Sequence, residues 1–312
     1  MMRIAMVVTP FNDQNLQLAR QIGVTDIVVR YPGSQVEDLL PLCQQVEADG
    51  MSVAVVEGHL PIDRIVLGMD GWQSQVEELS CLIRSMGACG VGVLCYNWMG
   101  VTDWTRTSET TPGRGGALCT EFDRDKAEAL GPIDGPRVGA AALWENLERF
   151  LEKILPVAEE AGVALAMHPD DPPLTPLRGL ERIMVDPEAF ERLVAISPSR
   201  ANGICFCQGN FAAMGVDVPA TIHRLGPHIR FVHSRDVKGT PDHFVETFHD
   251  DGPTDMYAAI KAYADTGFDG VMRPDHVPVL AGESGEAGYT MMGRLFAVGY
   301  LRGLMEATTK RA

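Results

Sequence analysis

Short apolar runs recur along the chain, and within them apolar and polar residues do not alternate. Runs of Val, Ile, Leu and Ala without alternation are typical of strands that are buried on both faces, as in a parallel sheet. The pattern predicts strands at Arg3–Val8, Asp26–Val29, Ser52–Val56, Gly90–Leu94, Ala164–Met167, Gly203–Phe206, Ile229–Val232 and Gly270–Met272.

The segments between these runs carry apolar residues at helical spacing and several end on glycine, as helices commonly do. The clearest predicted helices are Asn15–Gly23, Gln75–Gly90, Leu143–Gly162 and Asp255–Gly270, the last with Asp255 as N-cap and a stop at Gly267. Strands that alternate with helices predict a parallel α/β fold, and their number favours a closed (β/α)8 TIM barrel. A doubly wound open sheet is the alternative, but no G-x-G-x-x-G sequence or phosphate-binding loop follows the first strand.

One stretch, residues 102–138, has no periodicity and is rich in Thr, Gly, Pro and Asp. Loops of this length in a compact domain are usually functional or disordered. Because it follows the fourth predicted strand directly, it would lie over the mouth of a barrel, where active sites form. We therefore expect residues 1–312 to form a single TIM-barrel domain with one long loop over its active-site mouth.

Charge and composition narrow the choice of partners. The chain has 42 acidic and 26 basic residues, and a net charge of −16 repels nucleic acid and anionic membrane surfaces. No apolar stretch reaches the ~18 residues that a membrane span requires, and the N-terminus lacks the features of a signal peptide. The cysteines are odd in number, seven in all, and several lie in apolar runs. This usage favours free thiols in the cytoplasm over a disulfide framework.

Metal-capable side chains follow each of the last four predicted strands. They are His168, Cys205 or Cys207, His233 and Asp275. Each alone has an ordinary structural explanation, but four such groups at one end of a barrel are hard to produce by chance. Two imidazoles, a thiolate and a carboxylate can bind a divalent transition metal. Cys205 and Cys207 share one face of their strand, and Cys207 is the predicted ligand because it lies at the strand end, beside Gly209.

The ligand His168 begins the stiff and polar sequence "HPDDPP". Its prolines restrict the backbone. One of Asp170 and Asp171 could accept a hydrogen bond from the second imidazole nitrogen of a ligand histidine, and the other could cap the following helix.

Other polar groups near the strand ends are candidates for substrate binding and catalysis. The candidates for binding an anionic substrate are Asn97, Arg106, Arg235, Lys238 and Arg273, which follow strands four, seven and eight. Without a glycine-rich phosphate cradle, their charges favour a carboxylate over a phosphate.

Two groups could transfer protons. His276 adjoins the predicted ligand Asp275 and should point elsewhere, towards the substrate. Tyr289 follows a glycine-rich loop and could lie over the mouth of the barrel, although a packing role at the start of the last helix fits it equally well. Of the remaining histidines, His249 in "ETFHDDG" is the most interesting.

Several motifs together resemble one known family. The sequences "CYNWMGVTDWTRT", "HPDDPP", "CFCQGN", "FVHSRDVKG", "ETFHDDGPTDM", "MRPDH" and "AGYTMMGRLFAVGYLRGLMEA" occur in the same order in the mannonate dehydratases of hexuronate breakdown. The resemblance covers roughly residue 92 to the C-terminus.

This resemblance implies a xylose isomerase-like barrel that binds Mn(II), with Fe(II) as the other candidate, and removes water from D-mannonate to give 2-keto-3-deoxy-D-gluconate. The family's metal ligands fall on His168, Cys207, His233 and Asp275, and its proton-transfer residues on His276 and Tyr289. A sugar isomerase or epimerase of the same barrel type and a non-catalytic sugar-acid binder are the alternatives; the former usually carries more glutamate ligands. Barrels of this kind often associate, so a homo-oligomer is a further expectation.

Overall fold

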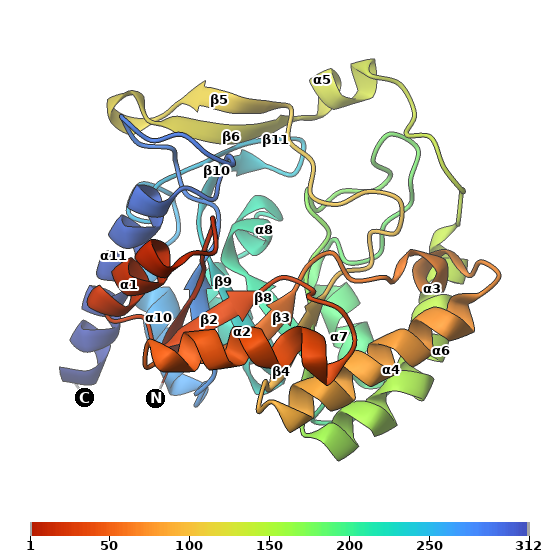
Figure 1. Ribbon diagram of the computed structural model, residues 1–312. Coiled ribbons are helices and arrows are strands. Elements are labelled where there is room, and N and C mark those ends of the chain that lie inside the picture. Colours follow the sequence, from red (N-terminus) through yellow and green to blue (C-terminus); the bar gives the residue numbers. More distant parts are fainter. Residues whose placement is uncertain (1, 311–312) are drawn as a thin grey trace.

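The computed structural model describes residues 2–310 and contains a closed barrel of parallel strands (Figure 1). In order around the barrel the strands are β1 (Arg3–Val7), β12 (Val271–Pro274), β9 (Ile229–Ser234), β8 (Asn202–Cys207), β7 (Ala164–Met167), β4 (Val93–Tyr96), β3 (Ser52–Glu57) and β2 (Asp26–Val29). The predicted (β/α)8 TIM barrel is confirmed, and each predicted strand overlaps an observed one. The open doubly wound sheet is excluded, because β1 pairs with both β2 and β12.

One long helix follows each barrel strand along the chain. These are α1 (Asp13–Gln21), α2 (Val36–Ala48), α4 (Trp72–Ala88), α6 (Ala140–Ala161), α7 (Pro187–Ile196), α9 (Val218–Leu225), α10 (Met256–Asp265) and α11 (Met291–Lys310). Shorter helices are α3 (Asp63–Leu67), α5 (Arg124–Ala129), α8 (Gln208–Ala213), η1 (Arg114–Gly116) and η2 (Gly226–His228). Asp255 caps α10 as predicted, accepting a hydrogen bond from the Ala258 amide. None of the helices that the structure describes is long and apolar enough to cross a membrane.

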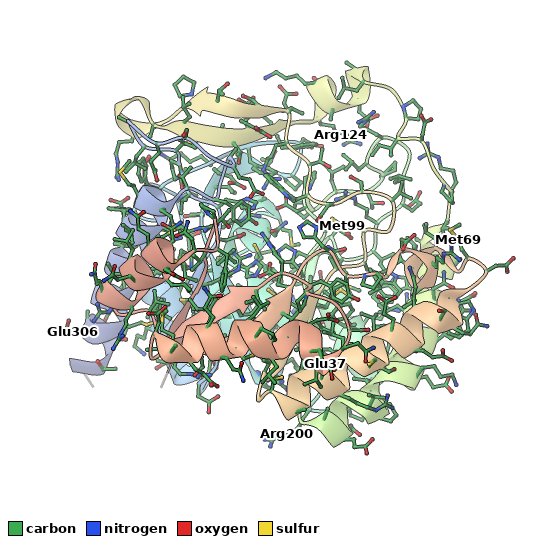
Figure 2. All side chains as sticks on the ribbon, in the orientation of Figure 1. Glu37, Met69, Met99, Arg124, Arg200 and Glu306 are labelled. Carbon is green, nitrogen blue, oxygen red and sulfur yellow. The ribbon has the colours of Figure 1, made fainter. Side chains whose placement is uncertain are left out.

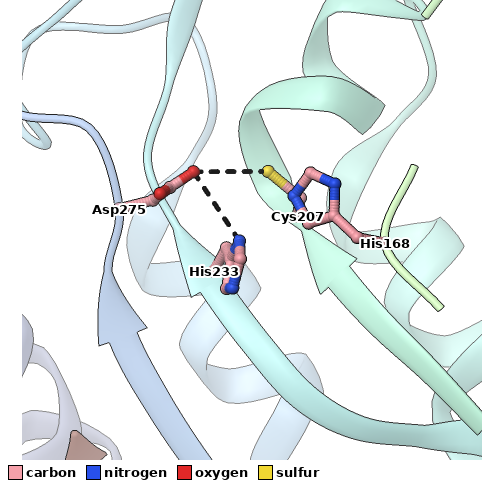
Figure 3. Close-up of side chains that lie close together, drawn as sticks. All are labelled: His168, Cys207, His233 and Asp275. Atoms are coloured by element: carbon pink, nitrogen blue, oxygen red, sulfur yellow. Dashed lines mark hydrogen bonds and ion pairs between the residues drawn. The ribbon is translucent and has the colours of Figure 1, made fainter. Parts of the chain in front are cut away.

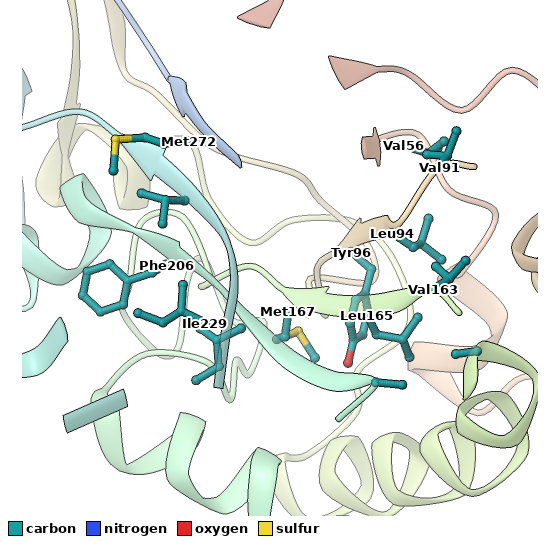
Figure 4. Packing of buried hydrophobic residues seen from close by; sticks show 14 of the residues in the cluster. Val56, Val91, Leu94, Tyr96, Val163, Leu165, Met167, Phe206, Ile229 and Met272 are labelled. Carbon is teal, nitrogen blue, oxygen red and sulfur yellow. The ribbon is translucent and has the colours of Figure 1, made fainter. Parts of the chain in front are cut away.

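Side chains alternate between the barrel interior and the helical layer. The interior holds mostly small or medium side chains, such as Ala5, Cys95 and Cys205, together with the ring of Phe231. The intervening residues pack outwards into the main core, among them Leu94, Leu165, Phe206 and Met272 (Figure 4). The same alternation continues to the strand ends. A residue two positions after an interior residue, at the end of its strand, therefore projects into the barrel mouth.

Strand register places the chemically important residues at one level. Cys207 on β8 is paired with His233 on β9, and His233 is paired with Arg273 on β12. Because the strands are parallel, these pairings bring the carboxyl ends of β8, β9 and β12 together.

A second sheet covers the mouth of the barrel and corrects the prediction for residues 102–138. Its strands, in order, are β10 (Val237–Thr240), β11 (His243–Glu246), β6 (Leu118–Asp123) and β5 (Ser108–Pro112). Figure 1 shows this sheet at the top, opposite the end where the two termini lie. The stretch predicted as loop therefore contains two strands and α5. Its pairing partner β11 is more than a hundred residues away along the chain (Phe244↔Phe122), so local periodicity could not reveal it.

Charged side chains are concentrated on the outside of the helical layer. In Figure 2, Arg200 and Glu306 lie at the edge of the molecule, and Glu37 belongs to the outer helix α2; all three are exposed. This distribution makes the ionisable groups buried at the barrel mouth an exception that requires a physical explanation.

Candidate functional site

The four predicted metal ligands lie together at the mouth of the barrel. One donor atom from each of His168, Cys207, His233 and Asp275 lies within 4.8 Å of the others (Figure 3). The Asp275 Oδ2 atom is 3.7 Å from both the Cys207 Sγ atom and the His233 Nδ1 atom. Two ligands of one ion, each bound at about 2.0–2.3 Å, lie no more than about 4.6 Å apart, so these two distances suit a shared ion.

The imidazoles also fit a metal centre. The Nδ1 atom of His168 is 2.7 Å from the Pro169 carbonyl oxygen, an arrangement that leaves Nε2 as the available ligand atom. The Nδ1 atom of His233 faces the other predicted ligands, 3.7 Å from the Asp275 Oδ2 atom, and its Nε2 atom lies 3.3 Å from a Glu57 oxygen. A carboxylate beside the second imidazole nitrogen is a common partner of a metal-bound histidine.

Local charges hold Cys207 and Asp275 in their metal-binding forms. Burial alone would raise the pKa of the Cys207 thiol, but Arg235 and His168 overcome this effect and lower the pKa to about 5. Burial would likewise raise the pKa of Asp275, yet His276, Arg273 and Arg235 hold it well below its ordinary value. Both groups are therefore anionic at neutral pH, as metal binding requires.

Glu57, at the end of β3, completes the site and was missed in the sequence. Its carboxylate binds Arg273 through contacts of 2.7 and 3.0 Å and lies 3.3 Å from the Nε2 atom of His233. The strand-end rule that identified the ligands on the last four strands would also have found Glu57, because it directly follows the predicted third strand.

The two predicted proton-transfer residues are in contact with each other. The Nε2 atom of His276 is 3.2 Å from the Tyr289 hydroxyl. The indole of Trp104 covers His276 at a ring-centroid distance of 4.5 Å. Gly288 permits this arrangement: it has a φ of +79°, and a Cβ atom there would lie 3.2 Å from the His276 side chain. The adjacent glycine therefore allows the Tyr289 loop to pack against the imidazole.

Arg106 and Arg235 belong to a buried ion-pair network rather than to a free anion site. Both guanidinium groups bind Asp171 and Glu246, and Arg235 also lies 2.8 Å from Asp275. Their side chains are 2% and 1% exposed, so carboxylates of the protein already neutralise these charges. The sequence showed these cations but not their acidic partners, and a contact of either arginine with the substrate stays a prediction.

The other predicted substrate-binding residues divide into two groups. Arg273 and Asn97 line the cavity at the barrel mouth, beside His168, His233 and Asp275. Lys238 does not; its side chain is 54% exposed, and its ammonium lies 3.1 Å from the Asp251 carboxylate. Lys238 extends from an edge strand of the second sheet, β10, which the sequence did not predict, so its proximity to β9 in the chain was misleading.

Neither aspartate of "HPDDPP" has the predicted role. Asp170 accepts hydrogen bonds from the Ile183 and Met184 amides, in the loop that precedes α7, while Asp186 provides the N-cap of that helix. Asp171 binds Arg106 and Arg235, and His168 instead contacts the Pro169 carbonyl. The two aspartates thus fix a loop and anchor the arginine network.

His249 has a structural role. Its Nε2 atom lies 2.7 Å from the Ser234 carbonyl oxygen, and burial lowers its pKa to about 4. The neutral side chain connects the segment after β11 to the end of β9.

The site opens into a cavity of about 440 Å³, a volume that suits a small organic ligand. His168, His233 and Asp275 line it on the metal side, and His276 and Tyr289 line it beside them. Arg30, which the sequence analysis did not single out, also lines the cavity and lies 5.2 Å from the centroid of the Tyr289 ring. The arrangement combines a metal-binding set, a proton-transfer pair, the buried cation Arg273 and the partly accessible cation Arg30 around one small space.

Known proteins resemble this chain in sequence and in fold. The family model described as D-mannonate dehydratase (UxuA) matches residues 8–134 and 136–312. A mannonate dehydratase from Oceanobacillus iheyensis is 34% identical over 293 residues, covering 85% of this chain and 83% of the relative. One from Streptococcus agalactiae is 32% identical over 326 residues, covering 94% and 93% respectively.

Solved structures agree with these matches. The crystal structure of the mannonate dehydratase from Streptococcus suis serotype 2 superposes with a TM-score of 0.92 at 32% identity, covering 99% of this chain and 94% of that one. An L-ribulose 3-epimerase structure has a TM-score of 0.67 at 14% identity, a likeness of fold alone. The match to the family model and the two curated relatives each cover most of the chain. This chain belongs to the D-mannonate dehydratase family.

Proposed function

We propose that the protein is a metal-dependent hydro-lyase that removes water from D-mannonate and releases 2-keto-3-deoxy-D-gluconate. The observation that carries this proposal is the position of the His276–Tyr289 pair beside the His168, Cys207, His233 and Asp275 set. The pair and three of the four predicted ligands, His168, His233 and Asp275, line one cavity. The dehydratase family to which the chain belongs supplies the reaction class.

The proposed cofactor is Mn(II), with Fe(II) as the alternative. A mixed set of imidazole, thiolate and carboxylate donors suits divalent first-row metals of this kind. When bound, the ion supplies Lewis acidity that stabilises negative charge developing next to the substrate carboxylate.

The chain's own residues would perform the proton transfers. The reaction breaks the C2–H bond and the C3–O bond, forms a C2–C3 double bond, and the resulting enol becomes the 2-keto product. We assign His276 as the base that accepts the C2 proton at Nε2, and Tyr289 as the acid that protonates the departing C3 hydroxyl. Burial and the charge of Asp275 raise the pKa of Tyr289 despite Arg273 and Arg30, so its phenol keeps the proton that an acid must donate.

Substrate orientation is assigned to the polar groups that line the cavity. Arg30, Asn97 and Arg273 face this space, and Trp104 forms part of its wall beside His276. Arg106, Arg235 and Arg273 are each held by protein carboxylates. Arg30 lines the cavity as well, so it is our first candidate to contact the substrate carboxylate or a hydroxyl.

The test is incubation of Mn-loaded protein with a panel of aldonic acids that includes D-mannonate, followed by measurement of 2-keto-3-deoxy acid. Product from D-mannonate supports the proposal. If no panel member gives product while bound metal is confirmed, the proposal is wrong. Conversion without loss of water would indicate an isomerase or epimerase. Binding without turnover, unchanged in a His276→Asn variant, would indicate a sugar-acid binder.

Cytoplasmic location and self-association remain predictions. All seven cysteines are free thiols in the structure, which agrees with a reducing compartment. Sedimentation of the purified protein would measure its oligomeric state.

A further inference from the structure

A carboxylate from outside the barrel reaches the proposed catalytic pair. Glu246 is the last residue of β11, in the second sheet, and belongs to the "ETFHDDG" sequence that the proposed function has not used. Its side chain is only 4% exposed. Because β11 is not a barrel strand, the rule that active-site residues follow barrel strands does not explain this position.

Three side chains contact the same carboxylate oxygen of Glu246. The Oε1 atom is 2.7 Å from the Nδ1 atom of His276 and 2.8 Å from an Nη1 atom of Arg235. Arg106 donates to the same oxygen from Nε at 3.2 Å and also from Nη2. The two arginines can only donate hydrogen bonds, so they favour an ionised carboxylate.

The contact with Glu246 determines where neutral His276 carries its proton. An ionised carboxylate can only accept a hydrogen bond, so the ring proton must be on Nδ1. The lone pair is then on Nε2, which faces the Tyr289 hydroxyl at 3.2 Å and the cavity. This is the tautomer in which Nε2 can accept a proton from a substrate carbon.

We propose that Glu246 is a positioning residue of the dehydration, which fixes the tautomer and the ring orientation of His276 so that Nε2 acts as the base. This inference rests on the proposed function for the roles of His276 and Tyr289. Arg106 and Arg235 in turn keep Glu246 from taking the His276 proton: burial alone would raise the pKa of Glu246, but His276 and the two arginines hold it below its ordinary value.

A purely structural role for Glu246 would predict a different outcome on substitution. The second sheet is held by backbone pairing of β11 with both β6 and β10, which does not depend on this side chain. Asp171 provides a second carboxylate for both arginines. Replacing Glu246 by the isosteric glutamine keeps the side-chain volume and an acceptor oxygen, but the amide can also donate to Nδ1 and so permits the wrong tautomer.

The first experiment measures steady-state kinetics of Glu246→Gln with D-mannonate and Mn(II). In serine-protease triads, the equivalent acid-to-amide change lowers kcat by about 10⁴-fold. We expect at least about a 10²-fold fall in kcat here, with KM changed by less than about threefold, because the substitution affects the transition state and not substrate binding. A kcat within about threefold of wild type would overturn the proposal.

The matched control is Glu121→Gln. Glu121 lies on β6, the strand paired with β11, and its carboxylate contacts Lys126 and Thr111 rather than His276. It receives the same substitution in the same sheet, so a purely structural effect would appear in both variants. We expect Glu121→Gln to retain kcat within about twofold of wild type; an equal loss in both variants would contradict a specific role for Glu246.

A measurement on the wild-type protein keeps the inference testable if Glu246→Gln does not fold. Long-range ¹H–¹⁵N NMR correlations of the imidazole rings, recorded with a diamagnetic divalent ion and assigned by comparison with His276→Asn, report the tautomer. The proposal requires protonated Nδ1 and unprotonated Nε2 on His276, and the reverse tautomer refutes it. If wild type shows this tautomer but no turnover of D-mannonate, the proposed function fails while the positioning contact stands.

Discussion

Replacing Asp171 by asparagine tests whether the buried ion-pair network at the barrel mouth stabilises the fold. Asp171 is 1% exposed. Its Oδ1 atom lies 2.7 Å from Arg106, and its Oδ2 atom lies 3.0 Å from Arg106 and 2.7 Å from Arg235. An amide has no charge and one acceptor oxygen, so the substitution leaves two buried guanidinium groups short of a counter-charge.

Two independent arguments give the magnitude. Breaking a buried ion pair by removing one partner costs about 3–5 kcal/mol. Separately, Arg106 and Arg235 outweigh burial and lower the pKa of Asp171 from 3.8 to about 2, which corresponds to about 2 kcal/mol in favour of the folded state. With an unfolding entropy of about 2.1 cal/mol/K per residue, the 312 residues give about 0.66 kcal/mol/K. The expected loss of ~2–5 kcal/mol therefore lowers Tm by about 3–8 °C.

The assay is thermal unfolding at pH 7, with urea unfolding repeated at lower pH. Because the folded-state pKa of Asp171 is depressed, its stabilisation is complete above about pH 4 and is lost as the pH falls towards 2. The stability difference between wild type and Asp171→Asn should therefore shrink through this window. The control is Asp242→Asn, which breaks an exposed pair with Arg124 and should change Tm little. An unchanged Tm in Asp171→Asn, or a difference that does not depend on pH, would refute the reasoning.

Further predictions address the metal, Lys238 and the core. Treatment with a chelator should abolish turnover, and added Mn(II) or Fe(II) should restore it in the wild-type protein but not in Cys207→Ser. The metal content of Cys207→Ser, measured by elemental analysis, should fall at least about tenfold. Full metal content in that variant would remove Cys207 from the ligand set. Lys238→Ala should leave kcat and KM within about twofold of wild type, because its ammonium lies on the surface beside Asp251; a large rise in KM would restore it to the substrate site. Phe206→Ala should lower the free energy of unfolding by about 3–5 kcal/mol in urea titrations, since the ring is fully buried and stacks on Phe211 at 4.1 Å; a loss below 1 kcal/mol would show that the core collapses around the gap.

The local pattern of apolar and polar residues predicted those helices and strands whose formation depends on residues close by in the chain. The buried apolar runs predicted the barrel. The rule that parallel strands end at one edge predicted that four residues lie together there: His168, Cys207, His233 and Asp275. The partners of Arg106 could not be predicted in this way. The carboxylates that bind Arg106 belong to Asp171, in the loop after β7, and to Glu246, at the end of β11. The position of an arginine in the sequence does not show which acidic side chains will contact it in the fold.

The second sheet was missed for the same reason. β6 forms by pairing with β11, and β5 by pairing with β6. The sequence of β5, SETTP, is short and polar and has no strong strand pattern of its own. Glu246 and Trp104 reach the site through this sheet and its connections, so their roles became visible only in three dimensions. Glu57 differs, since it directly follows a predicted strand and could have been found.

The second sheet also determines the order in which the site can be assembled during folding. Glu246 of β11 contacts Arg106, in the segment between β4 and β5, and these two residues are 140 positions apart in the chain. Contacts of such long range form late, because the chain between them must be ordered first. In refolding, we therefore expect far-UV circular dichroism to report barrel formation before the fluorescence of Trp104, measured against a Trp104→Phe variant, reports its packing on His276. The protein would thus pass through a folded but inactive barrel, and activity would return only with the slower phase.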